Sequence, residues 1–142
     1  MAEKYKVLKT IEINADKSKV WDALINPEII KQYFFGTEVV SDWEVGSEII
    51  FQGEYQGTKY RDKGNILKIE TEKIIRYNYW SGFSGLEDKE ENYSIVTYEL
   101  NDENGKTRLS LTQENLANEQ SKEHSDKNWD IVLSQMKEII EK

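Results

Sequence analysis

The C-terminal segment, from about residue 119 to residue 142, constrains this chain most because it is one long amphipathic stretch. Its large apolar residues recur at steps of three and four: Trp129, Val132, Leu133, Met136, Ile139 and Ile140. That spacing places them on one stripe of an α-helix, with charged and amide side chains on the other side. A helix with one apolar stripe must bury it against a broad apolar surface. We therefore expect a long closing helix that packs across another layer of the fold.

Most of the upstream chain shows the short apolar alternation of β-strands. The strands are expected near residues 5–13, 38–40, 48–55, 60–70, 75–79, 92–100 and 109–113. Gln56-Gly57 and Asn104-Gly105 are expected to form hairpin turns, and Gly64 is expected to mark a bulge that bends the sheet. The pattern predicts a curved antiparallel sheet of six to seven strands with one solvent-exposed face and one covered face.

Two short helices in tandem are expected directly after the first strand. Asp16 can cap the first helix with its side-chain oxygen. Asn26-Pro27-Glu28 then supplies a cap, a proline at the first helical position and an acid in the first turn of the second helix, which Gly36 closes. With the sheet and the closing helix, this order predicts an α+β helix-grip fold.

Size and charge narrow the possible functions. The 142 residues suit a single domain, 1–142, that can bury a continuous core. Nineteen basic against 27 acidic residues give a net charge of -8, which disfavours binding to nucleic acid or an anionic membrane surface. The chain has no cysteine, no apolar signal segment and no apolar run long enough to span a membrane, so we expect a cytoplasmic protein.

Candidates for catalysis are few. His124, the sole histidine, lies in a polar segment near the start of the closing helix and is expected to be solvated. Four carboxylates lie on expected strands: Glu54, Asp62, Glu99 and Glu114. They could act as a general acid and base if two of them faced a cavity. The alternation of side chains along the strands, however, places most of them toward solvent. No motif for a metal, a phosphate or another cofactor is present, so no cofactor is expected.

Aromatic residues are abundant, with four Trp, eight Tyr and four Phe. Each ring alone would fit ordinary core packing. Taken together, rings from the strands and helices are expected to converge with Gln113 and Met136 on one interior, where hydroxyl and amide groups would be polar anchors for a small molecule. The residues predicted to bind it are Tyr33, Phe34, Phe51, Tyr55, Tyr77, Tyr79, Tyr98, Gln113, Trp129 and Met136.

Several segments resemble one known family. The run from Ala15 to Leu24, followed by Asn26-Pro27-Glu28 and Lys31-Gln32-Tyr33-Phe34, resembles the opening signature of the START-like (SRPBCC, Bet v 1-like) branch named after the activator of heat-shock protein 90 ATPase. Tyr33 stands where Trp is commoner in that branch. Later strands (64–67, 96–100 and 107–112) and the closing helix resemble the same branch, so the similarity runs from about residue 7 to the C-terminus. The resemblance implies a hydrophobic cavity between sheet and helix.

Three functions remain open from the sequence. The first is non-enzymatic binding of a hydrophobic or aromatic small molecule, such as a lipid, in that cavity. The second, implied by the resemblance, is a co-chaperone-like protein that modulates a heat-shock ATPase. The third is a cyclase- or dehydratase-like enzyme of the same fold, which would require two acid or base groups facing the cavity. A structure with no interior void larger than a few waters would count heavily against the first.

Overall fold

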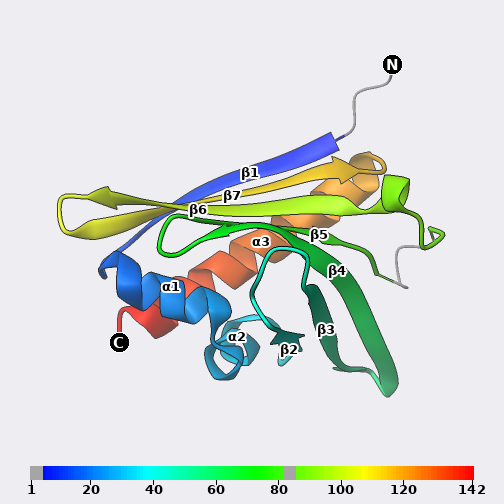
Figure 1. Ribbon diagram of the computed structural model, residues 1–142, viewed down its shortest axis with the longest axis horizontal. Helices are drawn as coiled ribbons and strands as arrows, with labels where there is room; N and C mark the ends of the chain where they lie inside the picture. The colour runs from blue at the N-terminus through cyan, green and yellow to red at the C-terminus, as the bar shows by residue number, and fades with distance from the viewer. Residues whose placement is uncertain (1–4, 82–85) are drawn as a thin grey trace.

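The computed structural model describes residues 5–81 and 86–142, except for the side chain of Tyr55. Its described residues form one antiparallel seven-stranded sheet with the strand order β1-β7-β6-β5-β4-β3-β2. Two short helices follow the first strand and a long helix ends the chain (Figure 1). The elements are β1 (Tyr5–Ile13), α1 (Lys17–Ile25), α2 (Pro27–Tyr33), β2 (Glu38–Ser41), β3 (Glu48–Tyr55), β4 (Thr58–Glu70), β5 (Ile74–Tyr79), the 3-10 turn η2 (Glu90–Asn92), β6 (Ser94–Glu103), β7 (Lys106–Leu116) and α3 (Glu119–Ile140). This is the predicted helix-grip α+β fold.

The helix starts follow the predicted capping chemistry. The Asp16 carboxylate accepts a hydrogen bond from the Lys19 amide at the start of α1. The Asn26 side chain accepts one from the Glu28 amide, and Pro27 opens α2. The α3 helix has the same device at Asn118. Each cap satisfies an amide that the first helical turn leaves unpaired.

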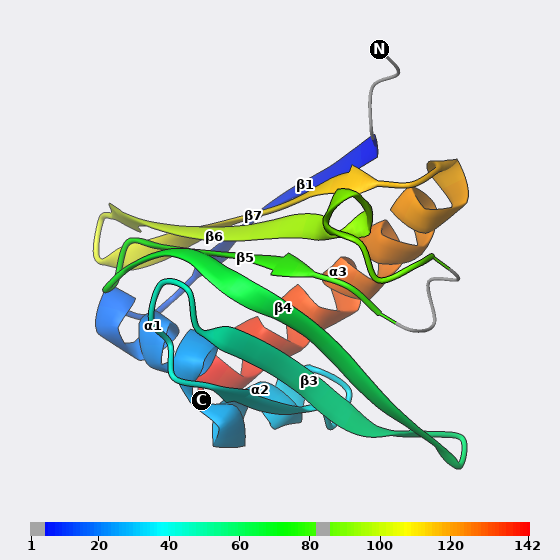
Figure 2. The ribbon, with the colours of Figure 1, turned by 45° about the vertical axis from the view of Figure 1, so that its right-hand side comes forward.

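Both predicted hairpin turns are present. Gln56 and Gly57 join β3 to β4, and Asn104 and Gly105 join β6 to β7; all four residues have positive φ angles. Paired positive φ values match the right-handed twist of the flanking strands. The long β3–β4 hairpin extends as an arm beyond the rest of the sheet (Figure 2).

The predicted bulge at Gly64 is wrong in position. The register between β4 and β5 shifts between Ile66 and Lys68. Gly64 has a different reason to lack a side chain, because a Cβ there would lie 1.7 Å from the backbone oxygen of Asn78. Glycine in this strand therefore marks a close backbone approach.

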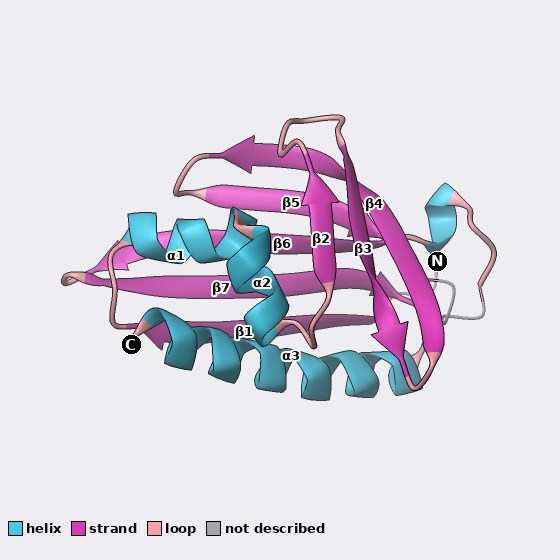
Figure 3. Ribbon diagram, turned by 90° about the horizontal axis from the view of Figure 1, so that it is seen from below, coloured by secondary structure: helices cyan, strands magenta, loops and turns pink. Residues whose placement is uncertain are grey.

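The α3 helix packs along the sheet with its predicted apolar stripe buried, and α1 and α2 lie beside it (Figure 3). Met136 is completely buried, whereas Ile139 is only partly buried. Lys9 on β1 forms ion pairs with Asp126 and Asp130 on the outer side of the helix. The apolar alternation of β1 predicted one buried face that includes Tyr5. Tyr5 is instead 41% exposed, and it lies at the start of β1, an edge strand of the sheet.

Among the described residues, none of the helices has the length and apolar character needed to cross a membrane.

Candidate functional site

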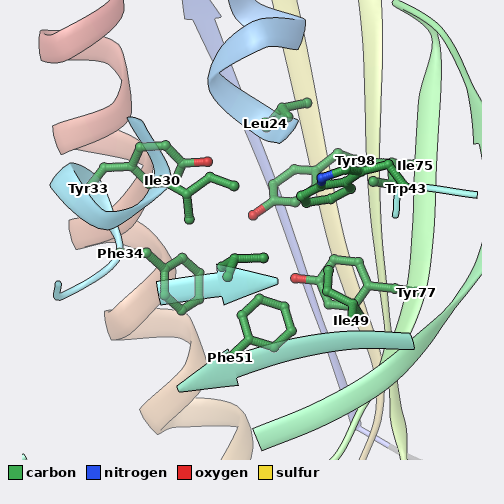
Figure 4. A pocket seen from close by; sticks show the side chains of 11 residues that line it. Leu24, Ile30, Tyr33, Phe34, Trp43, Ile49, Phe51, Ile75, Tyr77 and Tyr98 are labelled. Carbon is green, nitrogen blue, oxygen red and sulfur yellow. The ribbon is translucent and has the colours of Figure 1, made fainter. Parts of the chain in front are cut away.

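The candidate site is a small cavity between the concave face of the sheet and the helices. Side chains from α1, α2, the β2 and β3 region, β5 and β6 surround it (Figure 4). They are Leu24, Ile30, Tyr33, Phe34, Val39, Trp43, Ile49, Phe51, Ile75, Tyr77 and Tyr98. The cavity volume is about 20 Å³. That is room for about one water molecule.

The large void expected between sheet and helix is therefore not found at this site. Aromatic rings fill the space that a curved sheet leaves. The Phe51 ring packs against the rings of Tyr77 and Tyr79, with centroids 5.5 and 5.4 Å apart. By the criterion stated above, this outcome counts heavily against small-molecule binding in a preformed pocket. Any ligand larger than a water must displace side chains.

Three buried tyrosines supply most of the cavity's polar atoms. The Tyr33 hydroxyl donates a 2.8 Å hydrogen bond to the carbonyl of Ala23. The hydroxyls of Tyr77 and Tyr98 point toward the space between the helices and β3 (Figure 4). Burial raises the pKa of all three phenols well above the ordinary value. They are therefore neutral at physiological pH and can donate as well as accept hydrogen bonds.

Phe34 closes one side of the cavity. It directly follows α2, where the backbone leaves the helical conformation, and Phe35 and Gly36 continue with positive φ. Its ring packs on Phe51 and on Trp129, with centroids 6.0 Å apart in both pairs. One partly exposed ring thus joins the end of α2 to β3 and to α3.

Gln113 and Trp129 form a buried polar connection between β7 and α3. The Trp129 indole Nε1 donates to Gln113 Oε1 at 2.8 Å, and Gln113 Nε2 donates to the Ser94 hydroxyl at 3.0 Å. The side-chain groups of Gln113 are thereby paired within the protein. Gln113 was predicted to be a polar anchor for a ligand; in the structure its side chain connects β7 to the closing helix.

Asp62 is the strand carboxylate that turns inward. Its side chain is buried on the concave face, and its Oδ2 accepts a hydrogen bond from the Tyr79 hydroxyl. Burial and the carboxylate both raise the pKa of Tyr79. The other three candidates, Glu54, Glu99 and Glu114, are exposed, as their parity predicted. An acid–base pair built from two of these four carboxylates is therefore not assembled.

The ten predicted ligand-binding residues fall into three groups. Those that line the cavity are Tyr33, Phe34, Phe51, Tyr77 and Tyr98. Those that pack outside its lining are Tyr79, Gln113, Trp129 and Met136. The side chain of Tyr55, at the end of β3, lies outside the described part of the structure.

Sequence reasoning missed the aliphatic lining and Trp43. Leu24, Ile30, Val39, Ile49 and Ile75 were not among the predicted ligand-binding residues. The available signal was the apolar spacing of the two short helices and the apolar alternation of the strands. Trp43 lies in the connection between β2 and β3, where no periodicity exists to orient it.

His124 is exposed near the start of α3, and its Nε2 lies 3.1 Å from Nδ2 of Asn128. This agrees with the expected solvated position. Among the described residues, no cluster of three or more His, Cys, Asp or Glu side chains could hold a metal ion.

A curved antiparallel sheet that grips one long C-terminal helix, with two short helices after the first strand, defines the START-like class of proteins. The model of the family "Activator of Hsp90 ATPase homolog 1-like protein" matches residues 14–141. The chain belongs to this family. None of the curated proteins compared with the chain matches it.

Solved structures agree with this assignment. The solution structure of ChR145 from Cytophaga hutchinsonii is 42% identical, with a TM-score of 0.85 over 99% of this chain and 97% of that chain. The Aha1 dimer from Colwellia psychrerythraea is 16% identical, with a TM-score of 0.77 over 96% of each chain. CalU16 from Micromonospora echinospora is 21% identical, with a TM-score of 0.76 over 95% of this chain and 75% of that chain. The last two likenesses concern the fold alone.

Proposed function

We propose that this protein binds a hydrophobic or aromatic small molecule, without catalysis, in an enlarged form of the cavity between the sheet, α1 and α2. The ligand would enter by displacing Phe34, whose ring packs on Trp129 of α3. The observation that carries the proposal is the cavity itself, a space for about one water enclosed by aromatic and aliphatic side chains. Apolar walls with a few polar groups are typical of small-molecule sites. The hydroxyls of Tyr77 and Tyr98 are the polar groups in this one.

Phe34 is the suitable gate because its partly exposed ring directly follows the end of α2 and packs on both Phe51 of β3 and Trp129 of α3. Moving it would connect the cavity to solvent between α2, β3 and α3. When only a small fraction of the molecules is open, the apparent affinity for the ligand equals the intrinsic affinity multiplied by that fraction. Shortening this one side chain should remove that penalty.

The test compares F34A with wild type. Binding of the fluorescent aromatic amine 1-aminoanthracene is measured by titration, and native mass spectrometry of freshly purified protein looks for a co-purified ligand. F34A is expected to bind the probe about tenfold or more tightly than wild type, because about 1.4 kcal/mol of opening cost suffices for that factor. F35A is the matched control, since Phe35 is exposed next to Phe34 and does not line the cavity. Absence of binding by both wild type and F34A would refute the proposal.

A co-chaperone-like role is the second candidate, favoured by the family match. The decisive measurement is ATP turnover by the host's heat-shock protein 90, with and without the purified protein. An unchanged turnover at saturating protein eliminates this role.

The enzyme alternative has less support. It requires two acid or base groups facing the cavity, and Glu99 and Glu114 are exposed. Asp62 alone among the four candidate carboxylates turns inward.

A further inference from the structure

Asp62 carries an unsatisfied polar atom in the interior of the fold. Its residue exposure is 7%, and its Oδ2 accepts from the Tyr79 hydroxyl. Its Oδ1 is buried and has no hydrogen-bond partner among the described residues. A buried oxygen without a donor is costly, and native proteins rarely leave one unless a ligand, water or ion completes it.

Within residues 5–81 and 86–142, the polar groups around Asp62 do not supply the missing donor. The neighbouring strands continue a polar row across the concave face, in which Ser94 and Gln113 are bonded to each other and Gln113 to Trp129. These groups are already paired within the protein. Asp62 is therefore the member of this row with spare acceptor capacity.

Asp62 lies beside Phe51, just outside the lining of the cavity. The two residues are direct cross-strand partners on β3 and β4. The Phe51 ring lines the cavity and also packs against Tyr79, the donor to Asp62. Displacement of the rings of Phe34 and Phe51 would extend the cavity toward Asp62, the cross-strand neighbour of Phe51.

We propose that Asp62 is the specificity-determining anchor of the site and receives a hydrogen-bond donor, a primary amine or a hydroxyl, at the end of the ligand's apolar body. This inference rests on the proposed binding function and names the ligand class. An acceptor-only group such as a carboxylate is excluded because it would face the carboxyl oxygen of Asp62. The net charge of -8 acts in the same direction, favouring cationic over anionic ligands.

The experiment uses three probes with the same apolar chain: dodecylamine, dodecanol and dodecanoate, each displacing 1-aminoanthracene from the full chain. Wild type is expected to prefer the amine over dodecanoate by about tenfold or more, with the alcohol between them. In D62N, Asn keeps the shape and places an N–H donor at the free position. The amine should then lose about tenfold in affinity while dodecanoate gains.

D42N is the matched control, because Asp42 is exposed between β2 and β3 and its removal changes the net charge equally. It should retain the wild-type preference. Y79F is the second variant, since it removes the donor to Oδ2 and leaves both oxygens of Asp62 for the ligand. Its preference for the amine should equal or exceed that of wild type.

Failure of the two proposals is distinguishable. If none of the probes, 1-aminoanthracene included, binds wild type or F34A, the binding function fails and this inference falls with it. If all three ligands bind equally and D62N changes nothing, only the role of Asp62 is overturned. Should D62N fail to fold, the ¹³C shift of the Asp62 carboxyl in wild type decides. A shift with dodecylamine and none with dodecanoate supports the anchor, and the absence of any shift refutes it.

Discussion

The α-carbon of Gly64 lies so close to the carbonyl of Asn78 on the next strand that a Cβ would stand 1.7 Å from its oxygen. The Asn78 side chain also accepts a 2.6 Å hydrogen bond from the Asn65 amide. The backbones of β4 and β5 are thus in direct contact at Gly64, where any larger side chain would push the two strands apart. This relationship yields the first prediction.

G64A should destabilise the protein by about 3 kcal/mol or more, because backbone on a central strand cannot yield as a side chain can. G53A is the comparison. A Cβ at Gly53 would meet the hydroxyl end of Tyr60 at 2.7 Å, and that side chain can move at the expense of its hydrogen bond to Thr37. We expect a smaller loss of about 1–2 kcal/mol in G53A by urea denaturation. Equal losses in the two variants would contradict the close-approach explanation.

Q113L should lower the free energy of unfolding by about 1–3 kcal/mol, since it leaves the Trp129 indole N–H and the Ser94 hydroxyl buried without their partner. The control is Q135L, because Gln135 is exposed on α3, the helix that carries Trp129. The stability of Q135L should stay within about 0.5 kcal/mol of wild type. Chemical denaturation followed by tryptophan fluorescence measures both. A Q113L protein as stable as Q135L would show that the β7–α3 connection contributes nothing.

Y33F tests how α1 is joined to α2. Ala23 lies four residues before Pro27, which has no N–H to offer its carbonyl, and the Tyr33 hydroxyl donates to that oxygen instead. Loss of the hydroxyl should cost about 1–3 kcal/mol. Y5F, at an exposed tyrosine, should be neutral in the same thermal unfolding experiment. If the two variants unfold at the same temperature, the hydroxyl is dispensable.

The pH dependence of stability should include a contribution from Glu141. Hydrogen bonds from the Asn14 amide and from Lys137 lower the pKa of its carboxyl below the ordinary value of 4.5. A depressed folded-state pKa stabilises the protein above the unfolded value, and this stabilisation is lost as the pH falls through the folded pKa. E141Q should therefore lose less stability than wild type between neutral pH and about pH 3.

The control for that titration is E138Q, which removes the same charge from an exposed position of α3. Urea midpoints measured across the pH range provide the comparison. If the stability of E141Q fell as steeply with decreasing pH as that of E138Q, the hydrogen bonds from Asn14 and Lys137 to Glu141 would not contribute to stability.

The sequence by itself determined the order of the elements and the faces they bury. The caps at Asp16 and Asn26 and the turn at Asn104-Gly105 depend only on residues that are close in the sequence. Such local features can therefore be predicted from the sequence alone. The alternation of apolar residues along β5 and β6 likewise predicted that Tyr77 and Tyr98 face the interior, where both line the cavity.

Tertiary structure alone decided how full the interior is, because cavity volume depends on how rings from distant segments interlock. Phe34 and Phe51 are remote in sequence, yet their rings pack together and close the space. It also decided the orientation of Trp43, the use of Gly64 as a contact between strands, and the pairing of Gln113 with Trp129. The unsatisfied oxygen of Asp62 belongs to the same group, since only the assembled sheet shows that Tyr79 reaches one of its two oxygens.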